Sequence, residues 1–122
     1  MQFHWDEFLS LAKDLVNFKL QHCSEEAAYR SAISRAYYAA FCYIRDYVID
    51  NLEFNPEKNA NVHYLLREHL KKHGKIKVAS RLNELRMRRN RCDYDNEVIN
   101  NISFIANEAV ADAEELIKKF KK

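Results

Sequence analysis

Apolar residues recur at intervals of three and four along most of the 122-residue chain. This spacing places them on one face of an α-helix. The pattern predicts five helices, at about 5–21, 25–51, 62–73, 76–92 and 97–119. The chain has only one glycine and one proline, which leaves little material for the tight turns of a β-protein. We therefore expect an all-α fold in a single domain, residues 1–122.

The second predicted helix is apolar on two faces. One face carries bulky side chains such as Tyr37 and Phe41. The other face holds the small residues Ala28, Ala32, Ala39 and Cys42. A helix that is apolar on two sides lies at the centre of a protein or at an oligomer interface. We expect the small-residue face to pack closely against a second copy of the chain.

The overall charge excludes a general polyanion binder. The chain has 20 Lys and Arg against 18 Asp and Glu, a net charge of +2, so any contact with nucleic acid must be local. Its three cysteines are odd in number and lack a C-x-x-C spacing, which fits reduced thiols. No apolar stretch approaches the roughly 20 residues of a membrane span. We expect a soluble, cytoplasmic protein without a membrane segment.

One basic stretch concentrates the chemistry of the chain. Four arginines fall within six residues, 86–91, and run directly into Asp93, Tyr94 and Asp95. The apolar stripe of this helix is formed by Val78, Leu82, Leu85 and Cys92, and Arg89 falls inside it at helical spacing. A buried guanidinium is costly unless it is paired or faces a polar cleft. Arg89 therefore has a structural carboxylate partner, such as Asp93, or lines a functional pocket.

The histidines and tyrosines offer further candidates, each with a structural alternative. His69 and His73 lie one helical turn apart, but no third ligand is apparent, so we expect no metal site and no cofactor. His63 lies near the start of the third helix, where an imidazole with a pKa near ~6.5 suits general acid-base work. It is also suited to capping or packing that helix. The tyrosines of the second helix fit packing better than base stacking.

Two motifs together resemble the HEPN superfamily, in particular its small stand-alone prokaryotic members. The first is Ser34-Arg35-Ala36-Tyr37-Tyr38-Ala39-Ala40-Phe41, and the second is Arg89-Asn90-Arg91-Cys92-Asp93-Tyr94. The resemblance implies an up-and-down bundle of four main helices plus a short extra helix. It also implies a homodimer and a toxin-antitoxin partnership with a minimal nucleotidyltransferase protein.

Catalytic members of that superfamily are metal-independent ribonucleases with an Arg-x(4–6)-His motif at a cleft between two protomers. By resemblance, Arg89 and Asn90 match the opening of the motif, and Tyr94 matches a tyrosine that often follows. Asp93 stands about where the histidine would be. An aspartate with a pKa near ~3.9 is a poor acid at neutral pH, and its charge repels a phosphate. We therefore expect ribonuclease activity to be weak or lost, with His63 as the only substitute.

The resulting hypothesis is a defence or toxin-antitoxin component that binds RNA or nucleotide. The catalytic candidates are Arg89, Asp93 and His63. The binding candidates are Arg35, Arg86, Arg89, Asn90 and Tyr94. We expect Arg35, Arg89, Asn90, Asp93 and Tyr94 to converge on one polar cleft. The alternative is a non-enzymatic interaction subunit in which Arg89 and Asp93 form a structural ion pair, so the sequence leaves enzymatic activity open.

Overall fold

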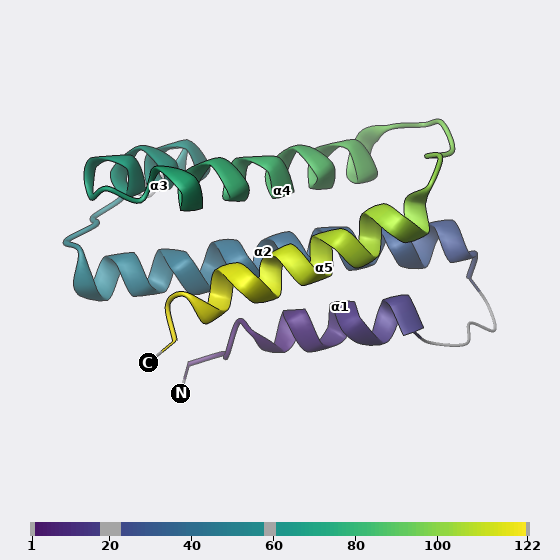
Figure 1. Ribbon diagram of the computed structural model, residues 1–122, viewed down its shortest axis with the longest axis horizontal. Helices are drawn as coiled ribbons and strands as arrows, with labels where there is room; N and C mark the ends of the chain where they lie inside the picture. Colours follow the sequence, from purple (N-terminus) through teal and green to yellow (C-terminus); the bar gives the residue numbers. More distant parts are fainter. Residues whose placement is uncertain (1, 18–22, 58–60, 122) are drawn as a thin grey trace.

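The computed structural model describes residues 2–17, 23–57 and 61–121, and its regular elements are five α-helices (Figure 1). They are α1 (Glu7–Asn17), α2 (Glu25–Asn51), α3 (Val62–Lys72), α4 (Ile76–Tyr94) and α5 (Ile102–Lys118). The long α4 runs in the same direction as α1, whereas α2 and α5 run in the opposite direction. The predicted all-α bundle of four main helices and a short one, α3, is confirmed.

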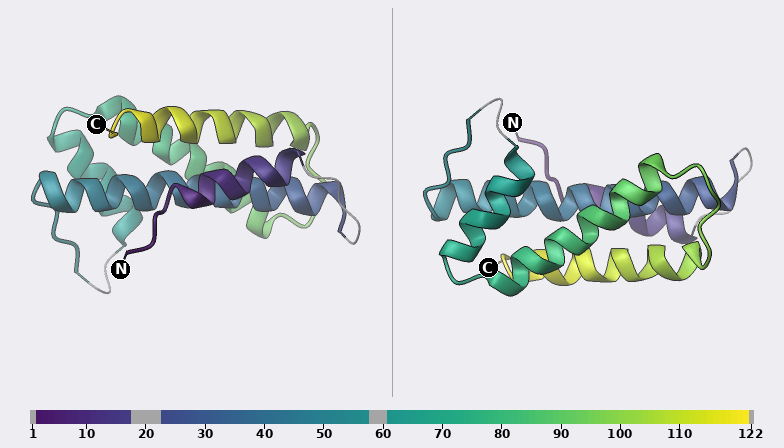
Figure 2. Two further views of the ribbon diagram at one scale, coloured as in Figure 1. Left: turned by 90° about the horizontal axis from the view of Figure 1, so that it is seen from below. Right: turned by 90° about the horizontal axis from the view of Figure 1, so that it is seen from above.

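The central element of the bundle is α2, which contacts each of the other four helices. Two further views show α1 on one side of the α2–α5 pair, with α3 and α4 on the other side (Figure 2). The core accordingly gathers around α2, where Ile33, Tyr37 and Ile44 are fully buried. None of the described helices is both long and apolar enough to cross a lipid bilayer.

The small-residue face of α2 corrects one sequence expectation. Ala28, Ala32, Ala39 and Cys42 are all buried within the protomer, because α2 contacts all four of the other helices. Their small side chains allow the neighbouring helices of the same chain to approach closely. This face is therefore unavailable to a second copy, and any homodimer must use another surface.

Local capping contacts explain where α2 begins and where α3 begins and ends. The Ser24 hydroxyl accepts a hydrogen bond of 3.1 Å from the backbone N–H of Ala27, and Asn61 caps α3 in the same way through Tyr64. Gly74 has a φ of +76° directly after the end of α3, a left-handed conformation that glycine adopts without strain. The predicted limits of α2 and α3 agree with these caps within a residue or two. The predicted end of the first helix falls in residues 18–22, outside the described part.

The connection between α4 and α5 differs from the expectation. The sequence placed the start of the last helix near Glu97, but α5 begins at Ile102, and α4 extends two residues past Cys92. The guanidinium of Arg30 on α2 donates to the backbone carbonyls of Cys92, Asp95 and Glu97 at 3.1, 2.6 and 2.5 Å. Glu26 accepts from the N–H of Ile99 at 3.2 Å and pairs with Arg30 at 2.8 Å. These tertiary contacts satisfy polar backbone groups that a helix would otherwise satisfy internally.

The burial of Ala32 leads to a test of the α2 packing. We expect Ala32→Glu to destabilise the fold by roughly 3–5 kcal/mol, because it would bury an unpaired carboxylate. Chemical denaturation monitored by circular dichroism measures this loss. Ala27→Glu is the matched control, because Ala27 is exposed in the first turn of the same helix, where a carboxylate favours the helix dipole. A folded Ala32→Glu protein with the stability of the wild type would contradict the internal packing of this face.

Candidate functional site

Arg89 lies on the buried face of α4, as the apolar spacing predicted. The buried positions of this helix are Val78, Ala79, Leu82, Leu85 and Cys92. The side chain of Arg89 is only 13% exposed, and its Nε is buried with no hydrogen-bond partner among the described residues. A donor left in this state is unfavourable unless another group satisfies it.

Aromatic rings from α2 hold the Arg89 guanidinium in place. Its Cζ lies 5.6 Å from the ring centre of Tyr37 and 5.3 Å from that of Tyr38, within the range of cation–π attraction. Its Nη1 also lies 3.3 Å from a carboxylate oxygen of Asp93, one helical turn further along α4. Arg89 thus has both a carboxylate partner and an aromatic support, and these fix the direction of its side chain.

His63, from the first turn of α3, lies next to this support. Its ring stacks on Phe41 with the centroids 4.1 Å apart and an interplanar angle of 16°. Its Nδ1 lies 2.5 Å from the hydroxyl of Tyr37. Burial lowers the pKa of His63 below its ordinary value. The positive charges of nearby guanidinium groups lower this pKa further, and Arg89 has the largest effect among them. The imidazole is therefore neutral at neutral pH.

Two more arginines approach the same imidazole. Arg67 follows His63 by one turn on α3 and donates to the backbone carbonyl of His63 at 3.2 Å. Arg86 lies one turn before Arg89 on α4 and donates to the side-chain oxygen of Asn83 at 3.1 Å. Burial lowers the pKa of Arg67, and the positive charge of Arg86 lowers it further, so these two guanidinium groups repel each other. We call Arg67, Arg86 and Arg89 the arginine cluster.

The arginine cluster has more positive than negative charge. Among the residues that the structure describes, its one ion-pair partner is Asp93, which pairs with Arg89. Arg35 extends the positive surface, because its Cζ lies 5.5 Å from the same Tyr38 ring that supports Arg89. Converging guanidinium groups beside a neutral imidazole are suited to hold an anion such as phosphate.

Comparisons with known proteins show the family to which the chain belongs. The family model of the HEPN domain matches residues 7–122. The chain belongs to the HEPN family. A protein of Methanocaldococcus jannaschii, described as uncharacterized, is 32% identical over 120 residues, covering 84% of this chain and 65% of the archaeal protein. The HEPN chain thus spans about two thirds of that relative. No solved structure matches this HEPN chain.

The structure brings together some of the predicted site residues and leaves others apart. Arg89 pairs with Asp93 and lies near His63, Arg86 also lies near the imidazole, and Arg35 is linked through the Tyr38 ring. The predicted convergence does not extend to Tyr94, whose side chain is 75% exposed. Within the described part of the chain, the side chains of Asn90 and Tyr94 form no hydrogen bond, ion pair or cation–π contact with the arginine cluster.

Sequence reasoning missed two residues of this site. Tyr37 was assigned to packing, but its hydroxyl also bonds to His63. Arg67 was not considered, although it follows His63 by four residues and therefore shares its face of α3. That spacing was a usable signal once His63 was a candidate. The contribution of Tyr37 could not be recognised, because it depends on how α3 packs against α2.

The other two arginines of the basic stretch lie outside the site. Arg91 is more than half exposed. Arg88 bridges to Asp112 at 3.0 Å and Glu108 at 2.8 Å on α5. Arg88 therefore ties α4 to α5, and its charge is balanced there.

The arrangement of histidines offers no metal centre in the described part of the chain. The rings of His69 and His73 lie 4.6 Å apart, but Nε2 of His69 is 2.6 Å from the backbone carbonyl of Leu52. No group of three or more potential ligands gathers among residues 2–17, 23–57 and 61–121.

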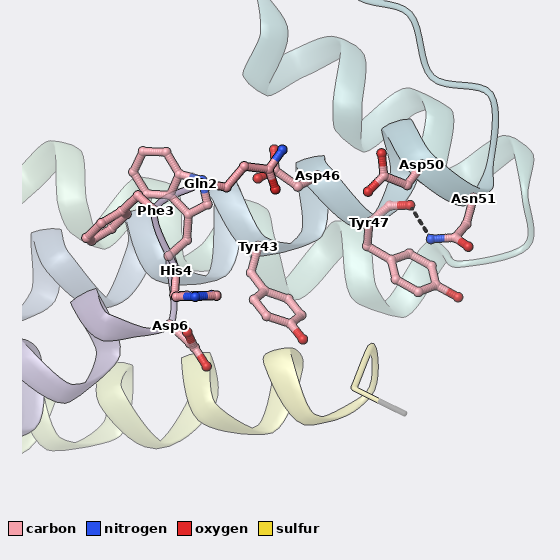
Figure 3. A pocket seen from close by; sticks show the side chains of 10 residues that line it. Gln2, Phe3, His4, Asp6, Tyr43, Asp46, Tyr47, Asp50 and Asn51 are labelled. Atoms are coloured by element: carbon pink, nitrogen blue, oxygen red, sulfur yellow. Dashed lines mark hydrogen bonds between the residues drawn. The ribbon is translucent and has the colours of Figure 1, made fainter.

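A separate pocket of about 340 Å³ lies between the N-terminal segment and the C-terminal half of α2 (Figure 3). It is lined by aromatic rings and by the carboxylates of Asp6, Asp46 and Asp50. Negative charge in this pocket would repel a phosphate. The arginine cluster is therefore the better place for an anionic ligand.

The environment of His63 also affects stability. Because the pKa of His63 is lowered in the folded protein, folding favours the neutral imidazole. The stability that the neutral imidazole contributes is fully present above the unfolded pKa near ~6.5 and is lost as pH falls through the folded pKa. We expect His63→Gln, which cannot be protonated, to lose less stability than the wild type between about pH 7 and pH 5. Urea unfolding at several pH values measures this slope. Parallel curves for the two proteins would contradict a lowered pKa.

Proposed function

We propose that this HEPN protein binds RNA or nucleotide through the arginine cluster, as a component of a toxin-antitoxin or related defence system. The observation that carries the proposal is the approach of Arg67, Arg86 and Arg89 to His63, with Asp93, paired to Arg89, as their one ion-pair partner among the described residues. Guanidinium groups hold phosphate through paired, charge-assisted hydrogen bonds. The Arg89 guanidinium supports the proposal, because within the described residues only its Nη1 donates to a carboxylate, at 3.3 Å, and a guanidinium has further N–H donors for a phosphate.

The same geometry supports binding better than efficient cleavage. General acid-base catalysis typically contributes about 10²–10⁴-fold, and it needs a group that can exchange protons near pH 7. Asp93 is a poor acid and is engaged with Arg89, so its role here is to orient the guanidinium. His63 is the remaining candidate, and it comes from α3 rather than from the α4 motif. We propose weak ribonuclease activity, or none.

The partner proposals follow the family resemblance. We propose a homodimer that works with a minimal nucleotidyltransferase protein. Because the small-residue face of α2 is buried, the contact surface would lie elsewhere. Met87 and Tyr94 on α4 and Val98 beyond it are large, exposed apolar side chains, which are typical of interaction surfaces when they gather. Arg35, Asn90 and Tyr94 remain proposed contacts for the nucleic acid.

The alternative is a non-enzymatic interaction subunit. The observation that favours it is the 3.3 Å contact between Arg89 and Asp93 on a mostly buried face of α4. In this alternative, the Arg89–Asp93 ion pair and the tyrosine rings beside it stabilise the bundle, and the arginine cluster binds no ligand. The two functions differ in their prediction for Arg67 and Arg86, which have no carboxylate partner in the described part of the chain.

The first functional test measures binding of a fluorescent single-stranded RNA by anisotropy. We expect Arg86→Ala and Arg67→Ala each to weaken binding about tenfold or more, because each removes charge-assisted hydrogen bonds to phosphate. Binding should also weaken as salt concentration rises. Arg91→Ala is the matched control, because Arg91 is an exposed arginine of the same helix. An equal loss in the control, or no binding by the wild type, would contradict this function.

The second test concerns cleavage. We expect the wild type to cut RNA weakly or not at all without metal, and His63→Ala to abolish any residual cutting. Asp93→His introduces an imidazole next to the histidine position of the family motif and should raise cleavage if the remaining geometry is preserved. Gel analysis of the RNA products in the presence of a chelator measures these rates. Robust metal-independent cutting by the wild type that survives His63→Ala would overturn the assignment.

A further inference from the structure

The hydrogen bond between Tyr37 and His63 determines more than the position of the imidazole. Tyr37 is fully buried in the core, and its hydroxyl lies 2.5 Å from Nδ1 of His63. The Phe41 ring, stacked 4.1 Å from the imidazole, prevents the ring from tilting away from this bond. The position of the proton in this bond therefore determines which nitrogen of the imidazole is a donor.

The phenol is the donor in this bond. Burial raises the pKa of Tyr37 above its ordinary value, so the O–H keeps its proton throughout the neutral range. A buried O–H requires an acceptor, and within the described residues Nδ1 of His63 is the one that it reaches. If Nδ1 carried a proton instead, two donors would face each other and the phenol proton would have no acceptor.

The remaining proton of the neutral imidazole then lies on Nε2. This atom makes no hydrogen bond to the described residues and is not fully buried, so its N–H remains available as a donor. The charged or titratable groups around His63 come from three helices. They are Tyr37, Tyr38 and Arg45 on α2, Arg67 on α3, and Arg86 and Arg89, with Asp93, on α4.

We propose that Tyr37 is a positioning residue that locks His63 as the neutral Nε2–H tautomer. This proposal rests on the proposed function, because the imidazole then donates a hydrogen bond to the phosphate held by the arginine cluster. A nitrogen that already carries a proton cannot accept one from a ribose hydroxyl. The tautomer therefore makes His63 a reader of phosphate and keeps it from acting as a general base through Nε2. The lock also opposes protonation, because Nδ1 is occupied by the phenol proton.

Tyr37→Phe tests the lock, because it removes the hydroxyl and keeps the ring. Without the phenol donor, Nδ1 is free to take up a proton, so the pKa of His63 should rise and its tautomers should mix. Long-range ¹H–¹⁵N correlation spectra of the ligand-free protein report both changes, and His63→Gln assigns the signals. The wild-type spectrum alone decides the tautomer, even where Tyr37→Phe does not fold.

Titration with adenosine 5′-monophosphate then tests the donor role. We expect Tyr37→Phe to bind about threefold to tenfold more weakly than the wild type near pH 7.5, the effect of one misplaced hydrogen bond. This loss should shrink as pH falls, because His63 of the variant becomes an imidazolium that attracts the phosphate. Tyr47→Phe, whose ring packs on Phe120 away from the site, should match the wild type.

The possible failures are distinguishable. A wild-type spectrum with the proton on Nδ1, or identical tautomers in the wild type and Tyr37→Phe, overturns the role of Tyr37 whatever the affinity. A wild type with the expected tautomer that binds neither the nucleotide nor RNA overturns the proposed phosphate-binding function, and the donor role with it. Equal weakening by Tyr47→Phe also overturns the lock.

Discussion

The hydrogen bond between Tyr37 and His63 connects the core of the bundle to its candidate site. The helices that contact α2 bury the Tyr37 ring completely, and a buried hydroxyl must be paired. Of the described residues, His63 on α3 supplies that partner. The same tyrosine ring faces the Arg89 guanidinium from α4. One side chain thus couples three helices, and a change in the packing of α2 would displace both polar groups of the site.

The arginines of α4 have different kinds of partner on the two sides of the helix. Arg88 meets two carboxylates of α5, so its charge strengthens the bundle. Arg89 meets the rings of Tyr37 and Tyr38 on α2, and Arg86 donates to the amide oxygen of Asn83 on its own helix instead of to a carboxylate. Guanidinium groups held near each other without full compensation raise the energy of the unliganded protein. An anion relieves that repulsion, which is why uneven charge balance points to binding more strongly than the number of arginines does.

The sequence predicted most of the fold and one essential part of the site. Helical spacing located the five helices, and the limits that it gave for α2 and α3 agree with the structure, where Ser24 caps α2 and Gly74 follows α3. The same spacing placed Arg89 on the buried face of α4. It placed the start of the last helix too early, because Arg30 and Glu26 on α2 hold the preceding backbone in a loop. Contacts between residues more than sixty positions apart leave no local signal.

What the sequence by itself determined is the periodicity of apolar and charged positions, and with it the helical class and the anomalous burial of Arg89. Only the tertiary structure decided what covers each face. It turned Ala32 inward within one chain, directed Arg88 to α5, and brought His63 to Tyr37. The physical reason is that periodicity describes one helix at a time, whereas burial, pairing and the proton position on an imidazole depend on groups from other helices. These are set when the helices pack together.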